Sequence, residues 1–373
     1  MKTLANISRL LVGVLFIISG FIKANDPLGF SYKLDEYFVV FHMEWLSHIS
    51  LALAILICAA EIGLGVATLM GARMNFTAWS LLLMIIFFTF LTFYSWYFNK
   101  VTDCGCFGDA LHLTPLQSFE KDLVLLVLIL FIFIGRKSIS PLLGDMPSTV
   151  VSWLGFAGSL FFSIQCYRHL PMIDFRPYKI GKNIQEGMKL PPNAKKGKVE
   201  MVFIYKHNGK EVELTTEQIS TIDSTYQYVD RKDKMLEEAD KPAIHDFTIT
   251  DMQGSDYTED ILNNPNYYFF LVAYQLDKTD AKVQGKINDF VNLCDQNKIK
   301  FIGLTSSSPK EVDAFRHEHN SMFPYYNADA TTLKTMIRSN PGLMLLKHGT
   351  VIAMWHYNDF PSFDDVKITY LGK

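Results

Sequence analysis

Long apolar runs dominate the first half of the chain. A run of about 20 apolar residues is long enough to cross the hydrocarbon core of a bilayer as a helix. Five runs stand out, at residues 4–22, 46–70, 76–98, 123–134 and 150–166. The fourth is short, but it extends back toward Pro115 through charged residues that suit a membrane interface. The pattern therefore predicts five membrane-spanning helices.

Residues 28–44, between the first two runs, mix aromatic with charged side chains. This mixture is typical of a helix that lies in the membrane interface. We expect this helix to cover the outer end of the bundle.

The second half alternates short strand-like and helical segments. Residues 171–198 hold several prolines and no hydrophobic period, which predicts a tether or an extended arm. A hairpin is expected around Asn208-Gly209, and the charged residues 221–240 are expected to be peripheral. Further on, the pattern predicts a hairpin over 245–254, strands at 267–274, 300–305, 343–346 and 351–355, and helices at 280–296 and 309–319.

The predicted fold class is a membrane α-helical bundle of four helices plus a fifth transmembrane helix, followed by an α/β domain outside the cytoplasm. The predicted units are the bundle at 1–137, the fifth helix at 149–167, a linker and β-hairpin region at 168–241, and the α/β domain at 242–373. Apolar residues crowd before Cys166 and charged ones after it, in agreement with this division. A net charge of -3 gives no reason to expect nucleic acid as a partner.

Basic residues in short loops predict the orientation of such a bundle. The two sides carry equal numbers, but the basic residues are denser in the shorter loops 71–75 and 135–147. We therefore expect the amino terminus inside. Five spans then place Cys104, Cys106, Cys166 and everything after Cys166 outside, in a compartment where disulfides persist. No small-residue cleavage site follows the first run, so we expect a retained helix rather than a signal peptide.

Residues 103–109, here called the thiol loop, read Asp-Cys-Gly-Cys-Phe-Gly-Asp after the third run. A bond between Cys104 and Cys106 would be strained, because Cα atoms two residues apart only partly reach the disulfide range of about 4.4 to 6.8 Å. Such a bond would be labile and oxidising. The alternatives are two small apolar fillers, or capture of a soft metal by an incomplete ligand set, so no metal site is predicted. Cys166, near the outer end of the fifth run, is a candidate resolving thiol.

Two charged residues lie inside the apolar runs, Arg9 in the first and Glu61 in the second. An ionisable group at that depth is costly and marks either a structural pair or a functional site. A pair between Arg9 and Glu61 and a role in proton or ligand handling both stay open.

The bundle resembles a known family. Residues 9–13, 19–23 and 61–65 are similar to the DoxX-type four-helix membrane family, and residues 103–108 resemble the loop of its MauE branch. The resemblance covers about residues 1–137. It implies a bacterial inner-membrane protein associated with redox processes and, for MauE-like members, with disulfide formation in a periplasmic partner.

Residues 242–367 resemble the thioredoxin-like fold of the TlpA and peroxiredoxin kind. Asn340-Pro341 falls where that fold carries a cis-proline. Redox thioredoxins place Cys-x-x-Cys after the first central strand, but residues 273–277 hold no cysteine here. Cys294 lies on the apolar face of a predicted helix and is expected to be buried. This domain is not expected to catalyse thiol exchange by itself.

Two functions of different classes remain. In the first, the thiol loop exchanges disulfides with an exported partner, which the thioredoxin-like domain holds at Asn340 and Pro341. In the second, the protein is a non-catalytic membrane scaffold whose domain binds partner proteins. A transporter that uses Arg9 and Glu61 comes third. No quinone or haem motif is readable, so no resident cofactor is predicted. The expected partners are exported periplasmic proteins and the lipid bilayer, and a membrane protein complex stays open.

Overall fold

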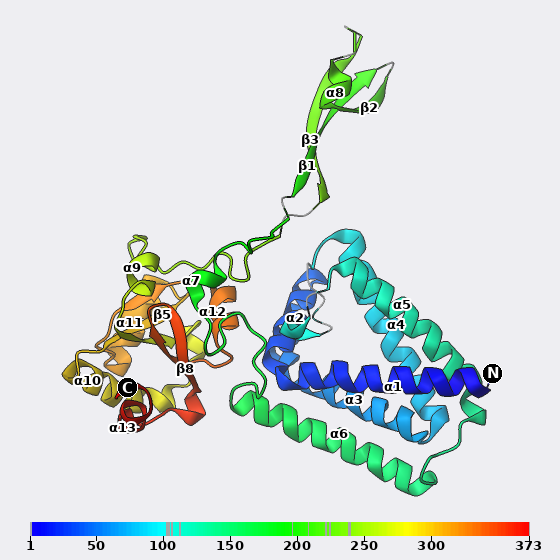
Figure 1. Ribbon diagram of the computed structural model, residues 1–373, viewed down its shortest axis with the longest axis horizontal. Helices are drawn as coiled ribbons and strands as arrows, with labels where there is room; N and C mark the ends of the chain where they lie inside the picture. Colours follow the sequence, from blue (N-terminus) through cyan, green and yellow to red (C-terminus); the bar gives the residue numbers. More distant parts are fainter. Residues whose placement is uncertain are drawn as a thin grey trace.

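The structure is a computed structural model that describes residues 2–101, 105, 107–111, 113–195, 197–207, 209–220, 222–223, 225–237 and 240–372. Figure 1 shows a bundle of long helices, an α/β domain beside one end of that bundle, and a small sheet that projects away from both.

The five predicted apolar runs all form helices. The helices of the bundle are α1 (Lys2–Asn25), α2 (Pro27–Val40), α3 (Ser50–Met70), α4 (Met74–Phe98), α5 (Pro115–Gly135) and α6 (Asp145–Arg168), with 3-10 turns at η1 (Glu44–Ile49), η2 (Gly108–Ala110) and η3 (Arg136–Ser138). Among the described residues, α1, η1 with α3, α4 and α6 are long and apolar enough to cross a membrane. Helix α5 has 21 residues, but three charged residues, 120–122, interrupt its first turns.

Helices α1 and α3 run antiparallel in close contact. A Cβ atom at Gly13 would lie 2.6 Å from Leu69 Cγ, and one at Gly65 would lie 2.9 Å from the carbonyl oxygen of Gly13. Glycines at these positions therefore let the two backbones approach, as small residues do in membrane bundles. The predicted interface helix is α2, which lies at the end of the bundle nearest the α/β domain (Figure 1).

The projecting sheet consists of β1 (Lys198–His207), β2 (Lys210–Thr215) and β3 (Gln227–Glu237), with the short helix α8 (Thr216–Ile219) after β2. The strands are antiparallel in the order β2-β1-β3, which confirms the predicted hairpin of β1 and β2. The third strand was not predicted, because charged residues fill β3 and hide its alternation. Val202 and Ile204 are buried on one face of the sheet.

The α/β domain has the thioredoxin-like fold. Its five strands are β4 (Tyr267–Val272), β5 (Lys300–Thr305), β6 (Tyr325–Asn327), β7 (Gly342–Lys347) and β8 (Thr350–His356). Their order is β6-β5-β4-β7-β8, with β4, β5 and β6 parallel and with β7 and β8 antiparallel to their neighbours. The helices are α9 (Thr258–Leu262), α10 (Gln284–Gln296), α11 (Pro309–His319), α12 (Ala330–Met336) and α13 (Phe363–Val366), and shorter turns are η4 (Leu276–Lys278), η5 (Ala281–Val283), η6 (Tyr357–Asp359) and the π-turn η7 (Lys367–Leu371).

Both faces of this sheet are covered, because side chains alternate along each strand. On β4, Phe269 and Leu271 join a core cluster with α10, whereas Phe270 and Val272 join a second cluster on the opposite face. This two-sided burial explains why β4 reads as a continuous apolar run.

Part of the predicted tether belongs to the core of the α/β domain. Tyr178 is 3% exposed, and Ile184, at the start of α7 (Ile184–Gly187), is 1% exposed. The backbone runs along β8, where the N–H of Gly181 donates to the carbonyl of Val351 at 2.8 Å. The tether prediction is therefore wrong for residues 178–188, because two large apolar side chains suffice to anchor a segment that has no regular period.

The hairpin predicted over residues 245–254 is confirmed in its turn, where the N–H of Gly254 donates to the carbonyl of Asp251 at 3.1 Å, but not in its strands. In the described residues 240–257 the chain forms a turn closed by an isolated bridge between Thr250 and Asp256, without paired strands. Thr250 instead hydrogen-bonds Asn327 of β6, with distances of 2.9 and 2.7 Å for the two backbone contacts.

His356, at the end of β8, predicts a pH dependence for this domain. The residue is 2% exposed, and burial lowers the pKa of His356 to about 4, with Asp359 opposing and His169 adding to the shift. The unfolded chain therefore binds a proton that the folded domain does not bind between about pH 6.5 and 4. The contribution of neutral His356 to the free energy of unfolding should be fully present above that window. It should be lost as the pH drops through the window.

Urea unfolding of the protein at pH 7 and pH 5 tests this dependence. We expect a lower urea midpoint at pH 5 than at pH 7. The difference between these two midpoints should be smaller in His356→Gln. The same substitution at exposed His317 is the control and should leave the difference as in the wild type. An unchanged difference in His356→Gln would contradict the assignment.

Candidate functional site

The thiol loop connects α4 to α5 at the end of the bundle nearest the α/β domain. Cys104 and Cys106 themselves lie outside the described residues. Gly105 between them is buried, with a φ of +66° that favours glycine, and a Cβ there would lie 2.9 Å from Lys33 Cγ of α2. The Lys121 ammonium lies over the ring of Phe107, with Nζ 5.4 Å from the ring centroid. The described part of the loop is thus packed against α2 and α5.

A cavity of about 50 Å³ lies inside the bundle next to this loop. Side chains from α1, α2, α3, α4 and α5 line it, together with Phe107, which follows Cys106 in the chain. Most of the lining is apolar, but two buried carboxylates, Glu61 and Asp122, are part of it.

Each of these carboxylates has a lysine partner and a hydroxyl partner. Glu61 accepts a hydrogen bond from Ser19 at 2.9 Å and pairs with Lys23 Nζ at 2.5 Å. Lys23 is 3% exposed, and its ammonium also lies 5.3 Å from the ring centroid of Phe30. The Ser19 hydroxyl and the Lys23 ammonium each face one oxygen of the Glu61 carboxylate and together offset part of the cost of burying it.

Asp122, on α5, repeats the arrangement. It accepts from Thr92 at 3.0 Å and pairs with Lys121 Nζ at 2.7 Å. The cavity therefore holds two opposite-charge pairs rather than one unpaired charge.

The pair between Arg9 and Glu61 considered from the sequence does not form. Arg9 donates to the carbonyl of Leu69 at 2.6 Å, near the opposite end of the bundle. The reason is the length of α1, since Arg9 and Lys23 are separated by about 21 Å of helix rise. Antiparallel packing brings Glu61 level with Ser19 and Lys23. The position of Glu61 deep in its apolar run correctly indicated a buried charge. Its partner Lys23 was missed, because Lys23 follows the first apolar run and was assigned to a loop.

The remaining cysteines are buried. Cys58, Cys166 and Cys294 are free thiols among the described residues. Cys166 is 3% exposed on α6 and Cys294 is 0% exposed on α10. Burial raises the pKa of Cys294 to about 12, so this thiol is unreactive at neutral pH. The role of Cys166 as a resolving thiol stays a prediction.

The cis-proline expected from the sequence is present at Asn340-Pro341, just before β7. The Asn340 side chain donates to the carbonyl of Gln275 at 2.9 Å, which ties it to the segment after β4. Both Asn340 and Pro341 are buried. We call the surface formed by residues 274–277 and 334–341 the cis-proline face, and its role in partner binding stays a prediction.

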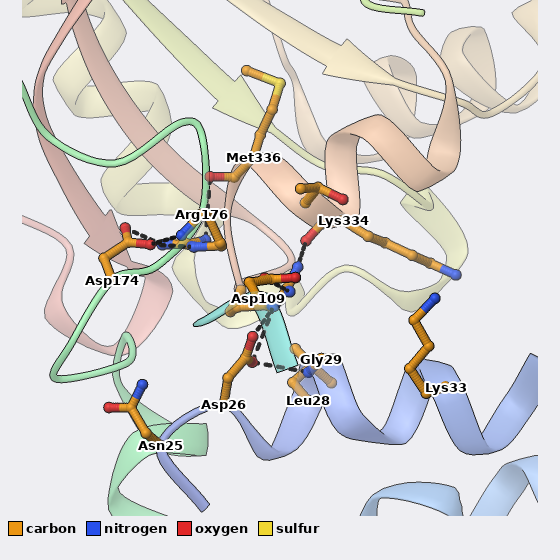
Figure 2. A network of polar contacts seen from close by, with 12 residues as sticks. Asn25, Asp26, Leu28, Gly29, Lys33, Asp109, Asp174, Arg176, Lys334 and Met336 are labelled. Atoms are coloured by element: carbon orange, nitrogen blue, oxygen red, sulfur yellow. Dashed lines mark hydrogen bonds and ion pairs between the residues drawn. The ribbon is translucent and has the colours of Figure 1, made fainter. Parts of the chain in front are cut away.

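The cis-proline face lies against the bundle, and Arg338 makes the central contact. Its Nε donates to both carboxylate oxygens of Asp26, at 3.0 and 2.8 Å, and its Nη2 donates to Asp109 at 2.9 Å. Figure 2 shows Asp26 and Asp109 close together at the start of α2, beneath the domain. Burial alone would lower the pKa of Arg338, but Asp26 and Asp109 outweigh burial and raise it.

Aromatic and backbone contacts complete this interface. The hydroxyl of Tyr32 on α2 donates to that of Tyr274 at 3.2 Å, and the Lys334 ammonium lies 4.8 Å from the Tyr32 ring centroid. Asn25, at the end of α1, exchanges two hydrogen bonds with the backbone of Ile173, at 2.7 and 3.0 Å. We call these contacts, together with those of Arg338, the docking contact.

The described residues contain no group of three or more His, Cys, Asp or Glu side chains placed to hold a metal ion. In the described part of the chain, this end of the bundle offers two carboxylate–lysine pairs and a thioredoxin-like domain without thiols at its cis-proline face.

Comparison with known proteins finds two matching families. Residues 1–135 match the family described as methylamine utilisation protein MauE, and residues 199–238 match a domain of unknown function (DUF8463). Protein TlpB of Flavobacterium psychrophilum is 25% identical over 128 residues, which are 34% of this chain and 35% of that protein. The match thus spans about a third of TlpB.

A solved structure also aligns with part of the chain. It is the solution structure of a candidate protein disulfide isomerase from Bacteroides thetaiotaomicron, at 16% identity and a TM-score of 0.27. The alignment covers 34% of this chain and 84% of that one.

The predicted resemblances are confirmed for the MauE-type bundle and for the thioredoxin-like fold. The protein is a multi-pass membrane protein in which a MauE-like bundle precedes a thioredoxin-like domain. The broader DoxX relationship stays a prediction.

Proposed function

We propose that this protein supports disulfide chemistry in exported proteins at the periplasmic face of a bacterial inner membrane, through Cys104 and Cys106. The observation that supports this most directly is the contact between Arg338 and Asp109. Asp109 belongs to the thiol loop, and Arg338 belongs to the thioredoxin-like domain. The loop and the domain therefore occupy the same end of the bundle, as a shared role in thiol chemistry requires.

The proposed reaction is a thiol–disulfide exchange. A thiolate of the exported protein attacks the disulfide of the thiol loop, and one loop sulfur leaves. A second thiolate of the exported protein then attacks this mixed disulfide. The exported protein gains a disulfide, and its two protons end on Cys104 and Cys106. The loop disulfide is the oxidant of this exchange and ends as two thiols.

The domain contributes recognition rather than chemistry in this proposal. Residues 273–277 hold no cysteine, and Cys294 is buried. The carboxylates of Glu61 and Asp122, each paired with a lysine, line the same cavity as Phe107 of the thiol loop. A strained two-residue disulfide would be oxidising, which suits transfer of a disulfide to another protein.

A scaffold function is the second candidate. The observation that favours it is the cis-proline face itself, which carries Tyr274 and Gln275 after β4 in place of thiols. In that case the protein holds partners or neighbouring membrane proteins without exchanging disulfides.

Replacing Cys104 and Cys106 by serine separates the two functions. We expect the variant to insert and fold normally, because both changes are nearly isosteric, while its exported partners accumulate with free thiols. Alkylation of periplasmic proteins followed by mass analysis measures that change. Cys294→Ser serves as the control and should leave partner thiols oxidised. Unchanged partner oxidation in the double variant would favour the scaffold.

A further inference from the structure

A second cavity lies at the other end of the bundle. Figure 1 shows the start of α1 at the end away from the α/β domain. A cavity of about 590 Å³ opens there, between the first turns of α1, the end of α3 and residues 138–142 after η3. This volume lies within the range of ligand pockets, about 300 to 1,000 Å³. The cavity is therefore large enough to hold a molecule rather than a single water.

The polar side chains of this cavity carry positive charge only. Lys2, Asn6 and Arg9 follow each other at spacings of four and three residues, which places them on one face of α1. The segment after η3 adds Ser138 and Ser140. Among the described residues that line the cavity there is no Asp or Glu. The lining thus combines two cations with hydroxyl groups, which is the chemistry of an anion site.

Arg9 is bonded by carbonyl groups alone. Its Nη2 donates to the carbonyl of Leu69 at 2.6 Å, and its Nη1 lies 3.5 Å from the carbonyl of Ser140. Carbonyls at the end of α3 attract a cation, but they carry only partial charges. A guanidinium has five N–H donors, and in the part of the chain that the structure describes no carboxylate pairs with Arg9. Its full charge and its remaining donors are therefore left for a ligand.

The depth of Arg9 indicates where that ligand comes from. Helix α1 has 24 residues and is thus about 36 Å long, against about 30 Å for the hydrocarbon core of a bilayer. Arg9 lies seven residues after the start of α1, about 10 Å along its axis. This position is close to the boundary between head groups and acyl chains, where a lipid supplies the anion.

Apolar side chains border the cationic part of the cavity. Leu10 and Leu142 line the cavity and are 60% and 62% exposed. We call these two leucines the apolar rim. A cationic pocket with an apolar rim at this depth matches both parts of a phospholipid, because basic pockets between membrane helices bind anionic head groups.

We propose that this cavity binds the head group of an anionic phospholipid. Arg9 and Lys2 bind the phosphate, and the two serine hydroxyls donate to phosphate or glycerol oxygens. The acyl chains lie over the apolar rim. The fork of an arginine suits phosphate because two parallel N–H groups can donate to two phosphate oxygens. The bound lipid joins α1, the end of α3 and the segment after η3. This inference goes beyond the proposed thiol chemistry and does not rest on it.

Lipid selection by the full-length protein in detergent tests the proposal. Delipidated protein is incubated with equal amounts of dioleoylphosphatidylglycerol, which has one net negative charge, and dioleoylphosphatidylcholine, which has the same acyl chains and no net charge. Bound lipid is then extracted and quantified by mass spectrometry. We expect the wild type to retain about tenfold more phosphatidylglycerol, since each basic residue at a membrane surface contributes about 1 kcal/mol toward anionic lipid. Arg9→Gln should reduce this preference to less than about twofold.

Two further variants show whether the cavity or the general charge of this end selects the lipid. Arg73 is exposed in the loop between α3 and α4 and does not line the cavity. Arg73→Gln removes the same charge and should keep the preference of the wild type. Lys2 is exposed, so Lys2→Gln leaves folding intact and should lower the preference about threefold. Equal losses in Arg73→Gln and Arg9→Gln would overturn the proposal, and so would an unchanged preference in Lys2→Gln.

Competition with inorganic phosphate distinguishes a lipid site from a site for a free ion. Inorganic phosphate in large excess should leave phosphatidylglycerol bound, because the acyl chains contribute contacts that the ion lacks. Displacement of the lipid by phosphate would overturn the assignment to a phospholipid. A wild-type preference in Arg9→Gln would reduce Arg9 to a cap for the carbonyls of α3. None of these readouts involves Cys104 or Cys106, so failure here leaves the proposed function untouched.

Discussion

Glu61→Leu is expected to destabilise the bundle by about 3–5 kcal/mol, because the Lys23 ammonium then stays buried without the carboxylate that faces it. The side chains of Lys23 and Glu61 are only 3% and 5% exposed. Thermal unfolding of the protein in detergent, followed by circular dichroism, measures the loss.

The double variant Lys23→Met/Glu61→Leu is the decisive comparison. It replaces the whole pair by apolar groups of similar size and should recover most of the lost stability. The exposed pair of Lys33 and Glu36 provides a matched control, and Glu36→Leu should change stability by less than about 1 kcal/mol. If Glu61→Leu behaves like Glu36→Leu, the buried pair does not hold the bundle together.

Ile184→Ala should cost the thioredoxin-like domain about 2–5 kcal/mol, the usual range for truncating a buried isoleucine. Ile184 is 1% exposed within the core cluster that contains Phe270 and Met344. The segment was predicted as a tether, and a tether residue would tolerate the change. Urea unfolding followed by tryptophan fluorescence measures the difference.

Ile180 offers the same substitution four residues earlier in the same segment. It is 59% exposed, so Ile180→Ala should stay within about 0.5 kcal/mol of the wild type. Equal effects of the two changes would show that the segment does not belong to the domain core.

The features predicted correctly from the sequence are those that a local pattern encodes. The lengths of the apolar runs predicted α1, α3 and α4, because a helix needs about 20 apolar residues to cross a bilayer. Alternation and a continuous apolar run gave β4 and β5 with α10 between them. The cis-peptide bond before Pro341 was implied by the resemblance to the thioredoxin-like fold rather than by a local pattern.

The features that were missed depend on individual contacts. Strand β3 is held by pairing with β1 although its own side chains are mostly charged. Residues 178–188 are anchored by Tyr178 and Ile184 rather than by a period. Arg338 and Asp26 are 312 positions apart in the chain, and no local pattern relates two residues at that separation.

The projecting sheet enters and leaves the rest of the protein at a single place. The N–H of Lys195 donates to the Asp240 side chain at 2.8 Å, and the N–H of Asp240 donates back to the carbonyl of Lys195 at 3.1 Å. Residues 199–238, matched as a separate unit of unknown function, fall between these two positions. The sheet is thus an insertion whose two ends meet at one hydrogen-bonded pair of residues. Such an insertion can be exchanged or deleted in evolution without a change in the strand order of the domain that carries it.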